Sequence, residues 1–83
     1  MKYILEQNNT LPEKLRELRY LAKPHVTQSE LAKKLYTNQT EISRIENGSY
    51  PTIITFINYC RYFRISADEL LKLTPENKIE YRE

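Results

Sequence analysis

The stretch TQSELAKKLYTNQTEISRIENG, from Thr27 to Gly48, carries the strongest structural signals in this sequence. Apolar residues recur in each half of it at the three- and four-residue spacing that places side chains on one face of a helix. These residues are Leu31, Ala32 and Leu35 in the first half and Ile42 and Ile45 in the second. The spacing predicts two short amphipathic helices joined by a tight turn.

Each of the two helices begins with a capping signal. Thr27 precedes Glu30 by three residues, and Asn38 precedes Glu41 by the same interval. In such a capping box the side chain of the first residue accepts a backbone N–H, and the carboxylate accepts the N–H of the cap residue. Gly48 follows the second helix and can adopt the left-handed conformation that ends a helix. Two short capped helices with facing apolar edges predict a helix-turn-helix.

Another helix is predicted before this pair. Thr10 is its cap, Pro12 and Glu13 lie in its first turn, and it ends before Pro24 because the residue ahead of a proline is pushed out of the helical region. Its apolar stripe consists of Leu11, Leu15, Leu18, Leu21 and Ala22. The spacing predicts that this helix packs one face on the core.

Two more helices are predicted after the pair. Thr52 is the cap of the first of them, and Ser66 with Glu69 forms a capping box for the second, which extends to Leu73. One face of the first is apolar and is expected in the core. It consists of Ile53, Phe56, Tyr59, Cys60 and Phe63.

The sequence therefore predicts an all-α fold of five helices in a single small domain. The domain is expected at residues 11–73, with an N-terminal arm at 1–10 and a C-terminal tail at 74–83. A chain of 83 residues buries only about three-fifths of its unfolded surface, so a second subunit would add stability. A single glycine disfavours a turn-rich β fold.

Composition argues against several functional classes. With one cysteine, Cys60, and one histidine, His25, neither a disulfide framework nor a metal site is expected, and no cofactor is indicated. No set of acid–base or nucleophilic residues points to an enzyme. The apolar stretch near Met1 is too short for a secretory signal or a membrane span, so a cytoplasmic location is expected. Because the net charge is only +2, binding to DNA would depend on local placement of polar and basic groups.

The run T-Q-x-E-L-A, then a turn, then I-S-R-I-E-N-G, resembles the lambda-repressor-like, Cro-type helix-turn-helix family, whose members are often called XRE-type regulators. Pro51 and the S-x-D-E-L run from Ser66 to Leu70 extend the resemblance, which covers roughly Leu11 to Leu71. It implies the five-helix fold and a DNA-binding transcription regulator that places the second helix of the motif in the major groove.

The turn departs from the family pattern at two positions. Tyr36 stands where glycine is common, and Thr37 stands where an apolar residue is usual. A residue other than glycine in a left-handed conformation costs on the order of 1 kcal/mol. We therefore expect a turn that is less stable or differently shaped.

The second helix of the motif begins with amide, hydroxyl and guanidinium groups, which hydrogen-bond base edges well. The predicted base contacts are Asn38, Gln39, Thr40, Ser43 and Arg44. For Gln39 the resemblance itself implies a base contact, and a bidentate pair with adenine would discriminate by roughly 1–3 kcal/mol. The residues alone leave open that Gln39 and Thr40 are only solvated, and that Arg44 holds a phosphate instead of a base.

Contacts to the DNA backbone are implied by the resemblance at Gln28, Asn47 and Ser49. Such contacts set the register on DNA and carry little sequence information. For Asn47 the alternative is that its side chain only closes the end of the helix beside Gly48.

Two glutamates lie on the predicted reading helix. Glu41 is explained by its capping-box spacing to Asn38, although a carboxylate can also accept a hydrogen bond from cytosine. In some family members a glutamate at the position of Glu46 pairs with an arginine on the first helix, and Arg19 is the candidate here.

A homodimer on a pseudo-palindromic operator is expected, because dimers of this kind place two reading helices roughly 34 Å apart on double-stranded DNA. Ile54 and Ile57 lie on the outer face of the fourth helix and are the predicted dimer contact, although isolated surface isoleucines can also be neutral. The strand-like segments at 3–5 and 79–81 are a second candidate.

The function predicted from these residues and from the resemblance is sequence-specific transcription regulation, most simply repression. The main alternative is an antitoxin that regulates its own operon and also binds a toxin protein. A protein-interaction module that has lost DNA binding is a further alternative, which the residues Gln28, Gln39 and Arg44 argue against.

Overall fold

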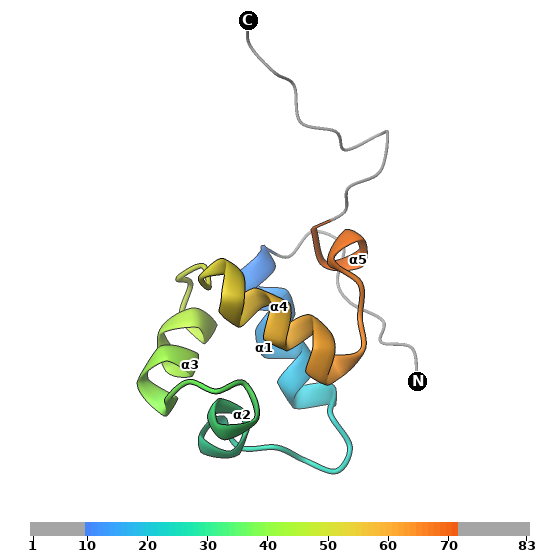
Figure 1. Cartoon of the computed structure of the whole chain (residues 1–83). Coiled ribbons are helices and arrows are strands. Elements are labelled where there is room, and N and C mark those ends of the chain that lie inside the picture. The colour runs from blue at the N-terminus through green and yellow to red at the C-terminus, as the bar shows by residue number, and fades with distance from the viewer. Residues whose placement is uncertain (1–9, 72–83) are drawn as a thin grey trace, which may run out of the picture.

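The structure, a computed structural model, describes residues 10–71, and this part of the chain is all-helical. The helices are α1 (Leu11–Leu21), α2 (Gln28–Lys34), α3 (Gln39–Glu46), α4 (Ile53–Phe63) and α5 (Ala67–Leu71) (Figure 1). The predicted all-α fold with five helices is confirmed. The strand-like segments of the arm and tail, and the last two residues predicted for the fifth helix, lie outside the described residues.

α1 and α4 lie at the centre of the molecule, with α2 and α3 together at one side and α5 at the other (Figure 1). α3 packs against both α1 and α2, and α5 packs against α1. The Lys14 side chain is buried between α1 and α5, and its Nζ donates to the Leu70 carbonyl at 3.0 Å. The core consists of Leu15, Leu18, Ala22, Val26, Leu31, Ala32, Leu35, Ile42, Ile45, Phe56, Tyr59, Phe63, Ile65 and Leu70.

The capping signals at the first two helices form as predicted. At the start of α2 the Thr27 hydroxyl accepts the N–H of Glu30 at 3.1 Å, and the Glu30 carboxylate accepts the N–H of Thr27 at 2.9 Å. The hydrogen bond from the Thr27 backbone lowers the pKa of Glu30. The same reciprocal pair joins Thr10 and Glu13 at the start of α1. These boxes satisfy backbone donors that a helix start leaves without partners.

At α3 only half of the predicted capping box is present. The Asn38 Oδ1 accepts the N–H of Glu41 at 2.9 Å. The Glu41 carboxylate does not return to the Asn38 backbone; its Oε1 lies 3.6 Å from Nη1 of Arg44, one turn along α3. The Arg44 guanidinium offers the Glu41 carboxylate another partner. The three-residue spacing of Asn38 and Glu41 does not reveal this competition.

The turn between α2 and α3 keeps a regular geometry without glycine. Tyr36 adopts a left-handed conformation with φ of 61°, and the N–H of Thr37 donates to the Ala32 carbonyl at 2.9 Å. This is the Schellman ending of a helix. α3 and α4 end with the same left-handed conformation, at Gly48 and Arg64. Tyr36 therefore closes α2 in a regular geometry, with backbone strain at this one residue.

Tyr36→Gly is expected to stabilise the protein by about 1 kcal/mol, because glycine adopts the left-handed conformation without the steric cost. The tyrosine side chain is 89% exposed, so its removal loses little packing. Urea unfolding at equilibrium measures the change. Tyr50→Gly is the control: Tyr50 is also exposed but does not have a positive φ, and glycine there should destabilise. If both variants lose the same free energy of unfolding, the assignment of strain to Tyr36 is contradicted.

Two of the predicted core residues are exposed. Ile53 is the first residue of α4 and is 69% exposed, and Leu21 is the last residue of α1 and is 41% exposed. Periodicity continues to the end of a helix, but the terminal turn extends beyond the elements that cover its middle. Cys60 is only partly buried, and burial raises the pKa of its thiol. Val26 and Ile65 are buried in connecting segments, where no periodic pattern marks them.

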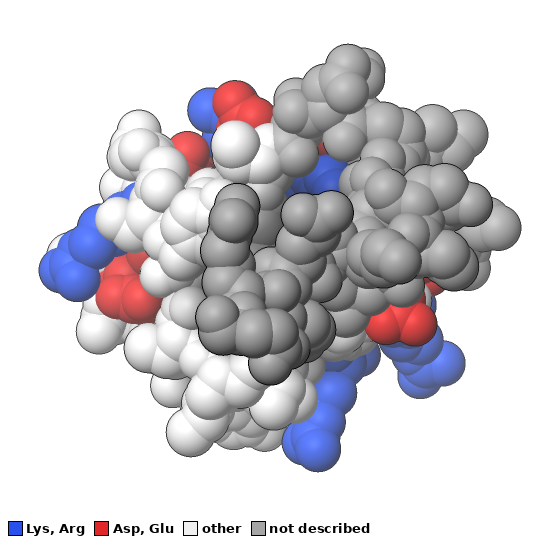
Figure 2. All heavy atoms as spheres, turned by 90° about the horizontal axis from the view of Figure 1, so that it is seen from above, with Lys and Arg blue, Asp and Glu red and all other residues white. Residues whose placement is uncertain are grey.

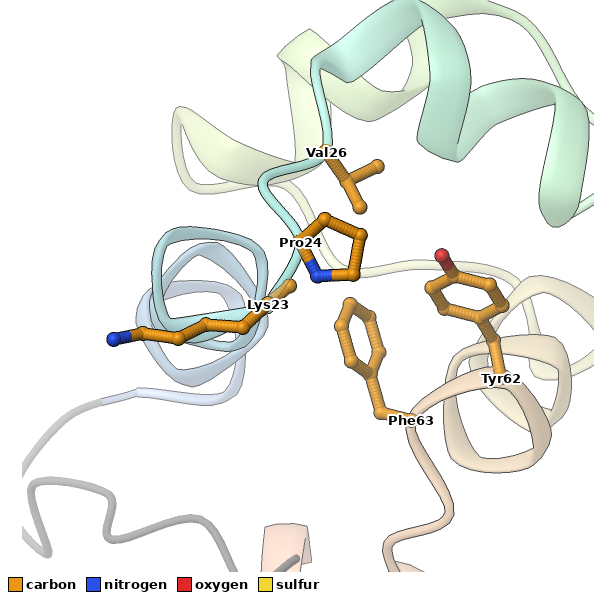
Figure 3. A pocket seen from close by; sticks show the side chains of 6 residues that line it. Lys23, Pro24, Val26, Tyr62 and Phe63 are labelled. Atoms are coloured by element: carbon orange, nitrogen blue, oxygen red, sulfur yellow. The ribbon is translucent and has the colours of Figure 1, made fainter.

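The linker between α1 and α2 packs against the end of α4. Val26 is buried, and Pro24, Val26 and the rings of Tyr62 and Phe63 surround one hollow (Figure 3). A hollow of about 250 Å³ remains between the linker and α4, lined by Ala22, Lys23, Pro24, Val26, Tyr62 and Phe63. Val26 of this linker therefore covers one end of the core.

Tyr59 is fully buried, and its hydroxyl has no hydrogen-bond partner in the described part of the chain. Burial also raises the pKa of this hydroxyl. Leaving a buried polar group without a partner is costly, so Tyr59→Phe is expected to stabilise the protein by about 1 kcal/mol. Thermal unfolding measures the change, and Tyr62→Phe, at a half-exposed position, should be close to neutral. A destabilised Tyr59→Phe variant would show that the hydroxyl is satisfied in solution.

Candidate nucleic-acid interface

The exposed side of α3 forms a shallow hollow of about 430 Å³. It is lined by Gln39, Thr40, Ser43 and Arg44, which are four of the five predicted base contacts. Their spacing along the helix places them on one face, while Ile42 and Ile45 on the opposite face are fully buried. α3 therefore presents amide, hydroxyl and guanidinium groups together on a surface that is open to a ligand.

The fifth predicted base contact, Asn38, does not line this hollow. Its side-chain oxygen accepts the N–H of Glu41 as the cap of α3, so its amide nitrogen and one lone pair of that oxygen remain for a ligand. Arg44 is mostly exposed, with its guanidinium near the Glu41 carboxylate. An exposed ion pair of this kind is weak, so the Arg44 side chain can exchange the carboxylate for another acceptor.

A buried ion pair fixes α3 to α1. Nε of Arg19 lies 2.7 Å from Oε2 of Glu46, and Nη2 of Arg19 lies 2.9 Å from Oε1. Nη1 of Arg19 also donates to the Val26 carbonyl at 3.1 Å. The hydrogen bond with Glu46 raises the pKa of Arg19, and both residues are buried. The candidate pair between these two helices is therefore present, in a bidentate geometry.

Gln28 connects this ion pair to the surface. Its Nε2 donates to Oε1 of Glu46 at 3.0 Å, and its Oε1 accepts a long hydrogen bond from Nε2 of Gln39 at 3.5 Å. Gln28 was predicted only as a contact to the DNA backbone. In the structure its amide lies between the buried carboxylate of Glu46 and the amide of Gln39, the predicted base contact. Gln28 therefore also orients Gln39.

Ser29 is a residue of this site that sequence reasoning missed. Its hydroxyl donates to Oε1 of Gln39 at 2.9 Å, from the first turn of α2 to the first residue of α3. No motif marks this serine, because the contact depends on how α2 and α3 cross.

The two other predicted phosphate contacts lie at the end of α3. The Asn47 amide nitrogen donates to the Ser43 carbonyl at 2.8 Å, so its side chain serves the helix end, which was the alternative interpretation. Ser49 is exposed, and its backbone N–H donates to the Arg44 carbonyl at 3.1 Å. Neither arrangement tests a contact with DNA.

Charge is distributed in small groups on the face that Figure 2 shows. Among the described residues there, Lys and Arg side chains lie mainly near the edge, several of them beside Asp or Glu. A broad basic surface would favour binding by charge alone. Because the net charge of the whole chain is only +2, local placement of polar and basic groups such as those of α3 would matter more than overall charge for binding to nucleic acid.

The predicted dimer residues lie on α4, outside the hollow on α3. Ile54 and Ile57 are both exposed, and Ile53 beside them is exposed as well. They are neighbours at helical spacing and form one apolar patch. Within residues 10–71, none of the helices is long and apolar enough to cross a membrane.

Comparison with known proteins gives two findings. A family model described as helix-turn-helix matches residues 14–70. The chain is also 38% identical over 60 residues to the HTH-type transcriptional activator BcrR of Enterococcus faecalis. That match covers 71% of this chain and 28% of the relative, so the matched part spans less than a third of that protein's length. No solved structure matches the chain significantly.

Proposed function

Because the chain belongs to the XRE-type helix-turn-helix family, we propose that it binds double-stranded DNA sequence-specifically and regulates transcription. The observation that carries the proposal is the hollow on α3, which Gln39, Thr40, Ser43 and Arg44 line together; Ser43 is partly buried and the other three are exposed. A major groove admits one α-helix, and amide and guanidinium groups distinguish base pairs there. The resemblance of the motif to family members that bind DNA supports the same use of α3.

In this proposal Gln39 and Arg44 contact bases, with Asn38, Thr40 and Ser43 beside them. Contacts to the DNA backbone come from Gln28, Asn47 and Ser49. The amide nitrogens of Gln28 and Asn47 already donate one hydrogen each, to Glu46 and to the Ser43 carbonyl. A contact with phosphate would use the second hydrogen of each amide or replace these bonds. Such backbone contacts would set the register of α3 and add little discrimination.

The regulator acts as a homodimer in this proposal, and Ile54 and Ile57 form the contact between subunits. Their exposure on one side of α4 supports this role, because a small domain gains stability by covering an apolar patch. Two domains then place two copies of α3 on a pseudo-palindromic operator.

Repression by occluding a promoter is the simplest consequence of such binding. The relative BcrR is named as an activator, which is a statement about that longer protein. A reporter gene placed behind the bound site is expected to show reduced expression when the chain is present. Increased expression would overturn the repressor part of the proposal and leave DNA binding in place.

Enrichment of duplexes from a random pool tests DNA binding itself. The full chain is expected to enrich a two-fold site and to bind it far better than random duplex at moderate salt, as measured by fluorescence anisotropy. Binding that is weak, uniform across sequences and lost with added salt would contradict the proposal, since charge alone produces that behaviour.

A further inference from the structure

We propose that Ser29 is a positioning residue for base recognition: Gln28 selects the orientation of the Gln39 amide that matches the edge of an adenine, and the Ser29 hydroxyl holds the amide in that orientation. The inference rests on the proposed function of α3. It names a side chain outside α3 that affects the base specificity of this helix. It follows from the donor and acceptor of each hydrogen bond in a series that joins Arg19, Glu46, Gln28, Gln39 and Ser29.

The direction is set at the buried ion pair. The Arg19 guanidinium can only donate, and the Glu46 carboxylate accepts from it through both oxygens. Because an ionised carboxylate has no proton to give, the Gln28 amide must turn its Nε2 toward Glu46, where it donates at 3.0 Å. The Oε1 of Gln28 therefore faces outward, toward Gln39.

The same reasoning fixes the next amide. The Oε1 of Gln28 can only accept, so Gln39 must present its Nε2 to it, and this contact is 3.5 Å long. The Oε1 of Gln39 then lies on the other side, where the Ser29 hydroxyl donates to it at 2.9 Å. Of the two contacts to Gln39 the one from Ser29 is much the shorter, so Ser29 contributes more to holding the amide.

The held amide keeps one donor and one acceptor for a ligand. Nε2 has two hydrogens, of which Gln28 takes one, and Oε1 has two lone pairs, of which Ser29 takes one. Adenine presents an acceptor at N7 beside a donor at N6 in the major groove, which is the complement of this pair. An amide turned the other way would offer its donor and acceptor in reversed order.

Substitution of Ser29 leaves the core untouched, since the residue is exposed. Ser29→Ala removes the hydroxyl, and Ser29→Thr keeps it. Gln39→Ala removes the amide that is being positioned. The double variant Ser29→Ala with Gln39→Ala reports whether the serine acts through the glutamine or independently of it.

The experiment uses the full chain and the two-fold duplex that it enriches. The position that loses its base preference in Gln39→Ala is identified first, and the four base pairs at that position are then compared by anisotropy competition. For Ser29→Ala we expect the preference for adenine to fall about two- to fivefold, the size expected for one neutral hydrogen bond. Preferences at other positions should not change, and Ser29→Thr should retain the adenine preference. In the Gln39→Ala background, Ser29→Ala should have no further effect.

Three outcomes would overturn the inference. An unchanged adenine preference in Ser29→Ala, with the preference lost in Gln39→Ala, would remove the role of Ser29 and leave the proposed function standing. A loss of affinity that is equal for all four base pairs, or that persists without Gln39, would show that Ser29 contacts DNA directly. If the unmodified chain enriches no site, the proposed function fails, and this inference fails with it.

Discussion

Glu46→Leu is expected to destabilise the protein by about 3–5 kcal/mol, because it leaves the buried guanidinium of Arg19 without its counter-ion. The Val26 carbonyl remains as an acceptor, but it carries no compensating charge. A chain of 83 residues has a total stability on the order of 4–12 kcal/mol, so the loss is a large part of it. The thermal midpoint should fall by roughly 12–40 °C.

The double variant Arg19→Met with Glu46→Leu separates charge from packing. Replacing both members of a buried pair with apolar residues is often close to neutral, so most of the lost stability should return. Glu41→Gln is the control, since its contact with Arg44 is partly exposed and should contribute less than about 1 kcal/mol. A Glu46→Leu variant as stable as this control would contradict the role given to the buried pair.

The second large effect is expected at the proposed dimer contact. Ile57→Glu places a charge in the apolar patch on α4 and should prevent association. Because the two half-sites are then bound independently, affinity for the two-fold site should fall at least about a hundredfold, while affinity for a single half-site stays the same. Ile54→Glu should act in the same way. Sedimentation and anisotropy measure the two parts of this prediction.

Leu21→Glu is the matched control for this experiment. Leu21 and Ile57 are exposed to the same extent, 41%, but Leu21 lies at the end of α1 outside the patch. The control should dimerise and bind the two-fold site normally. If both variants behave alike, or if the unmodified chain is monomeric when bound to DNA, the contact has been assigned wrongly.

Local signals in the sequence predicted most of the fold, because helix starts and apolar stripes depend on residues three or four apart. Thr27 with Glu30 forms its capping box as expected. The box at Asn38 is only half formed, because Glu41 lies near a cation on the next turn. Burial of Ile53 was predicted wrongly, since its exposure depends on where neighbouring helices end.

The sequence predicted which polar residues α3 exposes, but its local patterns did not predict the hydrogen bonds that join this helix to residues of α1 and α2. The polar pattern of α3 predicted that Gln39 and Arg44 are exposed, whereas a base contact of Gln39 was implied by the resemblance to the family. The pair between Arg19 and Glu46 joins residues 27 apart and was expected only through resemblance to a family. The contact of Ser29 with Gln39 depends on how two helices cross, which no local pattern encodes.

The central claim, that α3 reads bases, is tested most directly by comparing the sites that the unmodified chain and Gln39→Ala enrich from one random duplex pool. Asp68→Ala, on α5 and remote from α3, is the control. We predict that Gln39→Ala still binds but loses discrimination at one position of each half-site, by roughly 1–3 kcal/mol. The control should enrich the original site. An unchanged preference at every position in Gln39→Ala would contradict the claim.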